Sequence, residues 1–185
     1  AYALAWGVLL ARFVALIRRS PVPDKMHATL VALALGAGLV GVVAFAWGGT
    51  AAHGVVKRVG VWLFLLPVFV VVCHRMIPFF TANVVPFVTA FRPAWLLAAM
   101  VGAPVAHGLV DAAGAPQWTF VVDAPAALLM LAVTLRWGFA QTFVNRLLAM
   151  LHVGFLWFAI GFGLAAASSL IELAGGAGLG LAPLH

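Results

Sequence analysis

The sequence contains very few charged residues: 8% of its 185 positions are Asp, Glu, Lys or Arg, and only four of these are acidic. A soluble domain of this length is usually about a quarter charged and about half apolar. Here 66% of the residues are apolar and the mean hydropathy is +1.19. The shortage of charge excludes an ordinary soluble domain and favours an integral membrane protein in a lipid bilayer.

Cysteine is almost absent as well. The single cysteine, Cys73, excludes an intrachain disulfide framework and a cysteine-rich metal site. The net charge of +6 would suggest a nucleic-acid partner in a soluble protein. In this sequence the basic residues are scattered between apolar runs, so they indicate membrane topology and contacts with lipid headgroups, and we expect no nucleic-acid partner.

Most of the sequence consists of long apolar runs. Each is near the roughly 20 residues that a membrane helix needs, and alternating segments of about ten residues, typical of a membrane β-barrel, are missing. We predict an all-α membrane protein, a single transmembrane domain over residues 1–185 with a bundle of six transmembrane helices. The predicted helices cover residues 1–17, 27–48, 57–77, 93–111, 117–136 and 146–172. The chain opens inside an apolar run without Met and ends on LAPLH, so we expect a fragment of a longer polytopic protein.

The basic residues indicate the orientation of this predicted bundle. Ten basic residues fall in or near the predicted loops. One side has Arg12, Arg18, Arg19, Lys25, Arg75, Arg92, Arg136 and Arg146, whereas the other has only Lys57 and Arg58. The positive-inside rule places the Arg18/Arg19 loop in the cytoplasm and Asp111 outside, in a multi-pass membrane protein.

A polar residue inside an apolar membrane helix costs free energy, so we expect each one to have a bonding partner or a functional role. His152 lies six residues beyond Arg146, which places it roughly 9 Å deeper along its predicted helix. Its imidazole suits a metal or haem ligand, or a hydrogen bond to a neighbouring helix. Asp123 lies about two turns into the fifth predicted helix and suits a proton relay, an ion site or a salt bridge. A position near the interface, reached by water, is the other interpretation of Asp123.

The stretch CHRMIPFFTANVVPF, residues 73–87, adds a third polar cluster after an apolar run. Pro78 interrupts helical hydrogen bonding, so we expect irregular backbone here, dipping into a protein-lined site. Arg75 suits an anion such as a haem propionate, because guanidinium binds carboxylates through two hydrogen bonds. A snorkelling arginine at a helix end is the alternative. His74 is a further possible metal ligand, and the remaining histidines are weaker candidates.

Three motifs together resemble one family. RMIPFFTANVVPF is similar to the arginine-(hydrophobic)-Ile-Pro-Phe-Phe-Thr signature of the NnrS family. NRLLAMLHVGFLWFAIGF resembles that family's later Leu-His-(x)-Gly-(aromatic)-Leu-Trp helix, and the ending APLH resembles the start of its next helix. The order and spacing agree, and the resemblance covers essentially the whole chain. One departure is His74, which stands where the family commonly has glycine and is therefore a local feature.

The resemblance implies a polytopic protein of the bacterial inner membrane that contains haem and copper and is linked to the nitric oxide response or nitrosative-stress resistance, rather than a demonstrated enzyme. By motif position it implies that Arg75, Pro78 and His152 contribute to cofactor binding. It likewise makes His152 and His185 candidate metal ligands, whereas His74 departs from the family pattern and stays a candidate local ligand on its own chemistry alone. Nitric oxide or a related small molecule is the implied ligand. The alternative function, from the residues alone, is a transporter or channel in which Asp123 couples to protons or ions.

Overall fold

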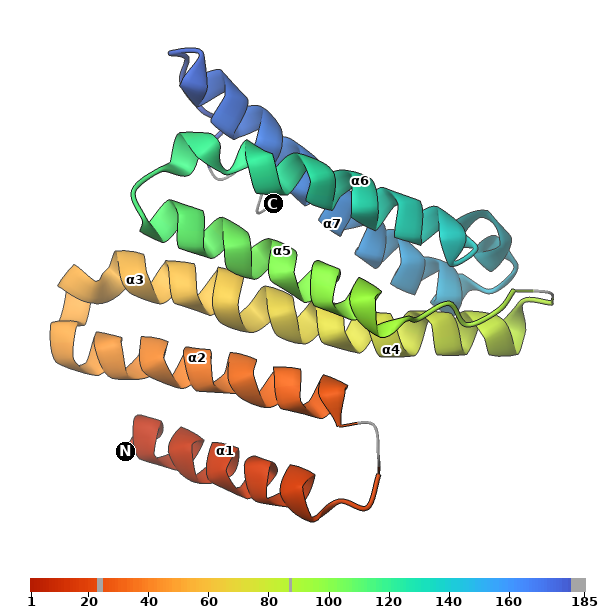
Figure 1. Cartoon of the computed structure of the whole chain (residues 1–185), viewed down its shortest axis with the longest axis horizontal. Helices are drawn as coiled ribbons and strands as arrows, with labels where there is room; N and C mark the ends of the chain where they lie inside the picture. Colours follow the sequence, from red (N-terminus) through yellow and green to blue (C-terminus); the bar gives the residue numbers. More distant parts are fainter. Residues whose placement is uncertain (23–24, 87, 181–185) are drawn as a thin grey trace. The chain divides into compact units, whose positions relative to one another are not determined.

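A computed structural model describes residues 1–22, 25–86 and 88–180. Its regular structure is entirely helical in this part of the chain, which confirms the predicted all-α class. The chain divides into two compact units, Ala1–Val72 and Cys73–His185. Each unit is built from helices that are joined by short connections (Figure 1).

The first unit contains α1 (Tyr2–Arg19), α2 (Met26–Gly48), a short 3₁₀ turn η1 (Gly49–Ala52), α3 (His53–Arg58) and the π-helical stretch η2 (Val59–Leu65). The chain reverses direction at η1 and α3, so that η2 packs back along α2 (Figure 1). α1 packs on the same helix, and the indole Nε1 of Trp6 donates to the backbone oxygen of Leu35 at 3.1 Å. α2 is therefore the centre of this unit.

The helix α4 (Leu66–Val84) contains the boundary between the two units. The second unit continues with α5 (Ala94–Ala112), the 3₁₀ turn η3 (Pro116–Trp118), α6 (Phe120–Arg136), the 3₁₀ stretch η4 (Phe139–Val144) and α7 (Arg146–Leu173). α6 and α7 form its most extensive helix pair (Figure 1). Asn145 begins α7 as its N-cap: the side-chain oxygen accepts from the backbone N–H of Leu148, as capping asparagines commonly do.

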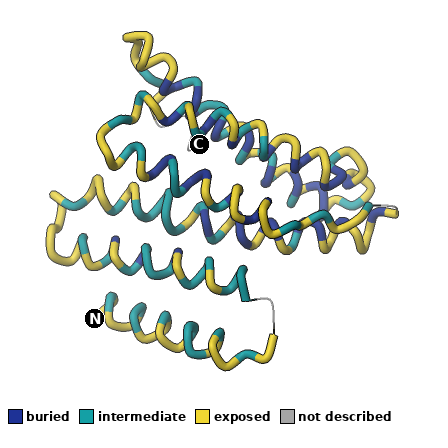
Figure 2. Tube along the Cα trace, in the orientation of Figure 1, coloured by how far each residue is buried: buried dark blue, intermediate teal, exposed yellow. Residues whose placement is uncertain are grey.

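Buried positions recur every three or four residues on the helices of the second unit (Figure 2). On α7 the buried stripe contains Leu148, His152, Phe155, Ala159, Phe162, Ala166 and Ser169. Corresponding stripes on α5 and α6 face the same interior, with Met100 and Met130 fully buried. This period is that of one helix face turned toward neighbouring helices. The polar residues of interest lie on these stripes, so the fold directs them inward.

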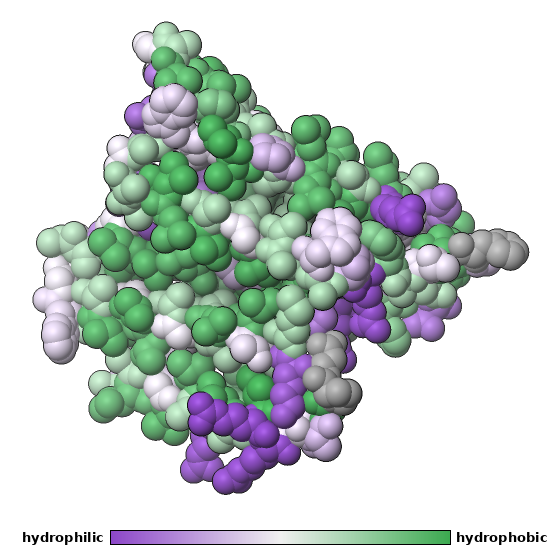
Figure 3. All heavy atoms as spheres, viewed as in Figure 1, coloured by the Kyte–Doolittle hydropathy of each residue, from purple (hydrophilic) through white to green (hydrophobic). Residues whose placement is uncertain are grey.

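The outward faces carry large apolar side chains such as Leu128, Leu135 and Leu147, which are 69%, 64% and 80% exposed. On the face shown in Figure 3, apolar surface dominates and hydrophilic residues gather in separate patches. Apolar helix faces without protein cover suit a lipid bilayer, because the backbone polar groups of a helix are satisfied internally. The helices therefore support the predicted membrane environment.

Three stretches of the described residues are long and apolar enough to cross a membrane: Met26–Val84, Ala94–Ala112 and Arg146–Leu173. The predicted number of six transmembrane helices is therefore not supported. Two of the predicted helices, 27–48 and 57–77, fall within the first stretch. The 18-residue α1 carries Arg12, Arg18 and Arg19, and the 17 residues of α6 span about 26 Å, less than the hydrocarbon thickness of about 30 Å.

Candidate functional site

His152 is fully buried on α7 and contacts a threonine on α4. The Nε2 atom of its imidazole lies 2.8 Å from the hydroxyl oxygen of Thr81, which is also fully buried. The same hydroxyl lies 2.8 Å from the backbone oxygen of Ile77, and a carbonyl oxygen can only accept. Because a hydroxyl has one proton, Thr81 donates to Ile77 and accepts from an Nε2–H of His152.

This assignment leaves the second nitrogen of His152 as an acceptor. Nδ1 is buried, and it has no hydrogen-bond partner among the residues that the structure describes. An imidazole that carries its proton on Nε2 has a lone pair on Nδ1. His152 therefore combines a nitrogen held by Thr81 with an unused buried lone pair, which is the electronic requirement for a metal ligand or for accepting another hydrogen bond.

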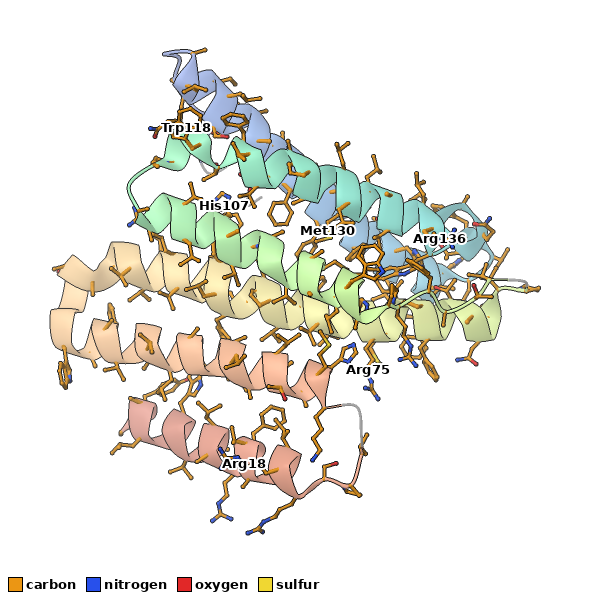
Figure 4. The ribbon with its side chains drawn as sticks, viewed as in Figure 1. Arg18, Arg75, His107, Trp118, Met130 and Arg136 are labelled. Atoms are coloured by element: carbon orange, nitrogen blue, oxygen red, sulfur yellow. The ribbon has the colours of Figure 1, made fainter. Side chains whose placement is uncertain are left out.

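A second buried pair joins α5 and α6. The Nδ1 atom of His107 lies 2.7 Å from one carboxylate oxygen of Asp123 and 3.0 Å from the other. Asp123 has no exposed surface, and the side chain of His107 is 11% exposed. His107 projects from α5 within the second unit (Figure 4). Asp123 is in the first turn of α6, where the helix dipole favours a negative charge.

His74 is also buried and lies against aromatic rings. Its ring centre is 6.4 Å from that of Trp137 in an edge-to-face arrangement, and Trp137 packs on Phe155 at 4.9 Å. The ring of Phe139 lies 6.4 Å from His152. Aromatic side chains therefore contact both His74 and His152, and they create an apolar surrounding for these imidazoles.

The backbone near Pro78 differs from the expectation. α4 continues through Pro78 to Val84 as regular helix, so the expected irregular backbone at this proline is wrong, and irregular structure begins only at Val85. Proline removes one helical donor, but the remaining bonds and the packing of this buried residue preserve the helix. Arg75 lies on an exposed face of α4, away from the buried stripe, and is labelled in Figure 4.

The structure brings the predicted residues into separate pairs rather than one cluster. His152 meets Thr81, and Asp123 meets His107, whereas Arg75 lies off the buried faces. No group of three or more His, Cys, Asp and Glu side chains suited to a metal ion occurs among the described residues. His185, a predicted ligand, lies outside the described residues.

The sequence did not predict Thr81 as the partner of His152 or the importance of His107. For His107 a signal exists, because His107 and Asp123 are equally far from Ala115 in the short α5–α6 connection. In an antiparallel helical hairpin, residues equidistant from the turn lie at the same level. Thr81 and His152 are separated by 71 positions, and no local pattern pairs them.

Comparison with curated proteins and with solved structures found no match. A family model described as NnrS protein matches residues 1–185, the whole of the chain. The match agrees with the helical, apolar structure and with the arginine–proline and histidine motifs on α4 and α7. The chain belongs to the NnrS family.

Proposed function

We propose that the protein is an integral membrane protein that binds haem and copper and acts in the response to nitric oxide or in resistance to nitrosative stress. The observation that carries the proposal is the family match along residues 1–185. Its chemical support is the burial of His74, His107 and His152 within apolar helices. Buried imidazoles are common ligands of iron and copper.

The buried histidines that the structure describes meet the ligand requirements of haem iron more readily than those of a copper ion. Haem iron needs as little as one protein imidazole, because the macrocycle supplies the in-plane nitrogens. A protein-bound copper ion needs several protein ligands, and the described residues contain no group of three or more suitable side chains. In this proposal a single histidine holds haem, and copper requires donors in addition to those that the structure describes.

The predicted site residues have distinct roles in this proposal. The buried Nδ1 lone pair of His152 fits a metal ion, while Thr81 holds Nε2 and fixes the ring. His74 supplies a second buried imidazole beside Trp137, and His185 remains a predicted ligand outside the described residues. The exposed guanidinium of Arg75 suits an anion such as a haem propionate, and Pro78 is a buried residue of the helix that carries both Arg75 and His74.

The experiment is the absorption spectrum of the full-length protein purified in detergent, together with its iron and copper content. We expect a Soret band, bound iron and copper, and a shift of the Soret band when nitric oxide is added. A well-folded sample that is supplied with both cofactors and yet shows neither a Soret band nor bound metal contradicts the proposal. A Soret band that nitric oxide leaves unchanged contradicts only the proposed ligand.

The second candidate function is a proton- or ion-coupled transporter or channel. The observation that favours it is the fully buried carboxylate of Asp123, bonded to a titratable imidazole in apolar helices. An Asp123→Asn variant in liposome flux assays is the test. Wild-type flux that the substitution abolishes supports transport, whereas equal flux in both proteins removes the relay role of Asp123.

A further inference from the structure

Two arginines border a hollow on the surface of α1. The hollow has a volume of about 390 Å³, and it is lined by Arg12, Ala15, Leu16 and Arg19. Arg12 and Arg19 are seven residues apart, which places them on one face of the helix, about 10 Å apart along its axis. Ala15 and Leu16 lie between them in the chain. A ligand in this hollow would therefore contact both arginine side chains.

No carboxylate compensates the charge of these arginines in the part of the first unit that the structure describes. That part contains no Asp or Glu, and no hydrogen bond or ion pair joins Arg12 or Arg19 to another described residue. Arg18 extends from the same end of α1 (Figure 4). Lys25 lies there as well, since its Nζ donates to the backbone oxygen of Arg18 at 3.4 Å. This end of the unit therefore attracts anions.

The helix continues from the hollow as an apolar surface. Residues 2–11 are uncharged over about 15 Å, which is half of the roughly 30 Å hydrocarbon core of a bilayer. Val8 and Leu9 lie one turn before Arg12 on the same face, and they are 60% and 70% exposed. Leu16, within the hollow, is 66% exposed. This face therefore combines a positively charged hollow with an apolar track about as long as one leaflet is deep.

A phospholipid with an anionic headgroup matches both parts of this face. Phosphate oxygens accept paired hydrogen bonds from guanidinium groups, and an acyl chain contacts exposed leucine and valine side chains. Arg12 lies about 9 Å before Arg18 along the helix, where lipid makes an uncompensated charge costly. A phosphate drawn to this arginine lowers that cost. A free phosphate ion would occupy the hollow alone and leave the apolar track without a ligand.

We propose that this face of α1 is a binding site for an anionic phospholipid. Its phosphodiester lies between Arg12 and Arg19, and an acyl chain follows Val8 and Leu9. α1 contacts α2 through a different face, where the indole of Trp6 donates to a backbone oxygen of α2 at 3.1 Å, so lipid binding leaves the helix pair intact. The site is independent of the proposed binding of haem and copper.

The experiment measures lipid binding to the full-length protein in detergent by native mass spectrometry. The probes are phosphatidylglycerol and phosphatidylcholine with the same acyl chains, and we expect the wild-type protein to prefer phosphatidylglycerol. Arg12→Gln/Arg19→Gln should remove this preference and weaken phosphatidylglycerol binding about 10- to 30-fold, because each arginine near a membrane surface contributes a factor of about five. The control Lys57→Gln/Arg92→Gln removes the same charge from two other exposed residues and should keep the wild-type affinity.

Ala15→Phe tests the hollow itself, because the added ring fills the space and both arginines remain. We expect it to lose the preference for phosphatidylglycerol. Arg12→Lys/Arg19→Lys keeps the charge without the paired hydrogen bonds, and it should retain part of the preference. Circular dichroism and size-exclusion chromatography check the folding of every variant. If the glutamine variant fails to fold, the phenylalanine and lysine variants decide the question.

Each other outcome overturns a stated part of the proposal. Wild-type affinity for phosphatidylglycerol in the folded glutamine or phenylalanine variant overturns the site. An equal loss in the Lys57→Gln/Arg92→Gln control means general electrostatic attraction and also overturns it.

Two further results identify a different occupant. Complete displacement of the lipid by millimolar inorganic phosphate indicates a site for free phosphate and overturns the lipid assignment. A wild-type protein without lipid preference, whose oligomeric state changes in the variants, indicates that a second copy of the chain covers this face. A wild-type protein that lacks haem and copper but keeps the lipid preference contradicts only the function proposed above.

Discussion

At the scale of single residues, Thr81 determines which imidazole nitrogen of His152 donates a hydrogen bond. Its hydroxyl accepts from one imidazole nitrogen and donates to Ile77, one turn earlier on its own helix. The contact connects α4 to α7 through two side chains that have no exposed surface. Between membrane helices such a bond contributes modestly, but a buried polar atom that loses its partner is costly.

Thr81→Val tests this contact, because valine retains the shape of threonine and removes the hydroxyl. We expect the free energy of unfolding to fall by about 1–3 kcal/mol, since Nε2 of His152 then loses its acceptor. The measurement is unfolding in detergent, with Thr81→Ser as the matched control that keeps the hydroxyl. Equal stability of the valine and serine variants would show that the bond contributes nothing measurable.

The sequence indicates which residues are unusual but not what they touch. A histidine and an aspartate within apolar runs stand out because lipid makes polar groups costly, and the structure shows His152 and Asp123 fully buried. Their partners were not predicted, since Thr81 is distant in sequence and resembles any other helical threonine. For Arg75 the sequence left an anion site and a snorkelling side chain open, because its exposure depends on which face of α4 packs inward.

At the scale of helices, small residues set the packing of α2. Ala34, Gly38 and Gly41 are its buried residues. A Cβ atom at Gly38 would lie 2.9 Å from the ring of Trp6 and 3.0 Å from that of Phe64. These two rings meet edge to face with centres 5.3 Å apart, so that residues of α1 and η2 meet over this glycine. The absence of a side chain at Gly38 is therefore required by the packing of the first unit.

Gly38→Ala should destabilise the first unit, because the two aromatic rings must move away from the added methyl group. We expect a loss of about 1–3 kcal/mol, the usual cost of overpacking. The control is Gly36→Ala on the same helix, where a Cβ atom would meet only Leu10, at 3.9 Å. That variant should be neutral or slightly stabilised, since alanine favours helix. Thermal unfolding of both proteins in detergent is the measurement, and equal melting temperatures would contradict the role of Gly38.

The helical class was predictable because long apolar runs leave few other folds in lipid. The uninterrupted course of α4 through Pro78 was not predictable. Pro78 suggested an interruption, but tertiary packing of the buried proline prevails over the loss of one backbone donor. Likewise, the sequence GAGLVG offers several pairs of small residues, and only packing selects Gly38 with Gly41 as the buried face.

At the scale of the whole molecule, the basic residues predict how the chain is oriented across the membrane. In a Cys73→Ala background, single cysteines at Ser20 and Ala113 report opposite sides. We expect a membrane-impermeant maleimide to label Ala113→Cys in intact spheroplasts and Ser20→Cys only after permeabilisation, because basic loops remain in the cytoplasm. The reverse labelling pattern would invert the proposed topology, and labelling of both from outside would mean that an even number of crossings, and not the predicted three, separates them.

The setting of Trp137 has a further, optical consequence. Its indole is only 1% exposed and donates from Nε1 to the backbone oxygen of Phe91 at 2.7 Å, whereas Trp47, Trp95 and Trp157 are largely exposed. The emission of a rigid, shielded indole is shifted to the blue, and it overlaps the Soret absorption of haem. A haem bound within the second unit would quench that emission by energy transfer. The protein's own tryptophan fluorescence would therefore report loading of the proposed haem without an added label.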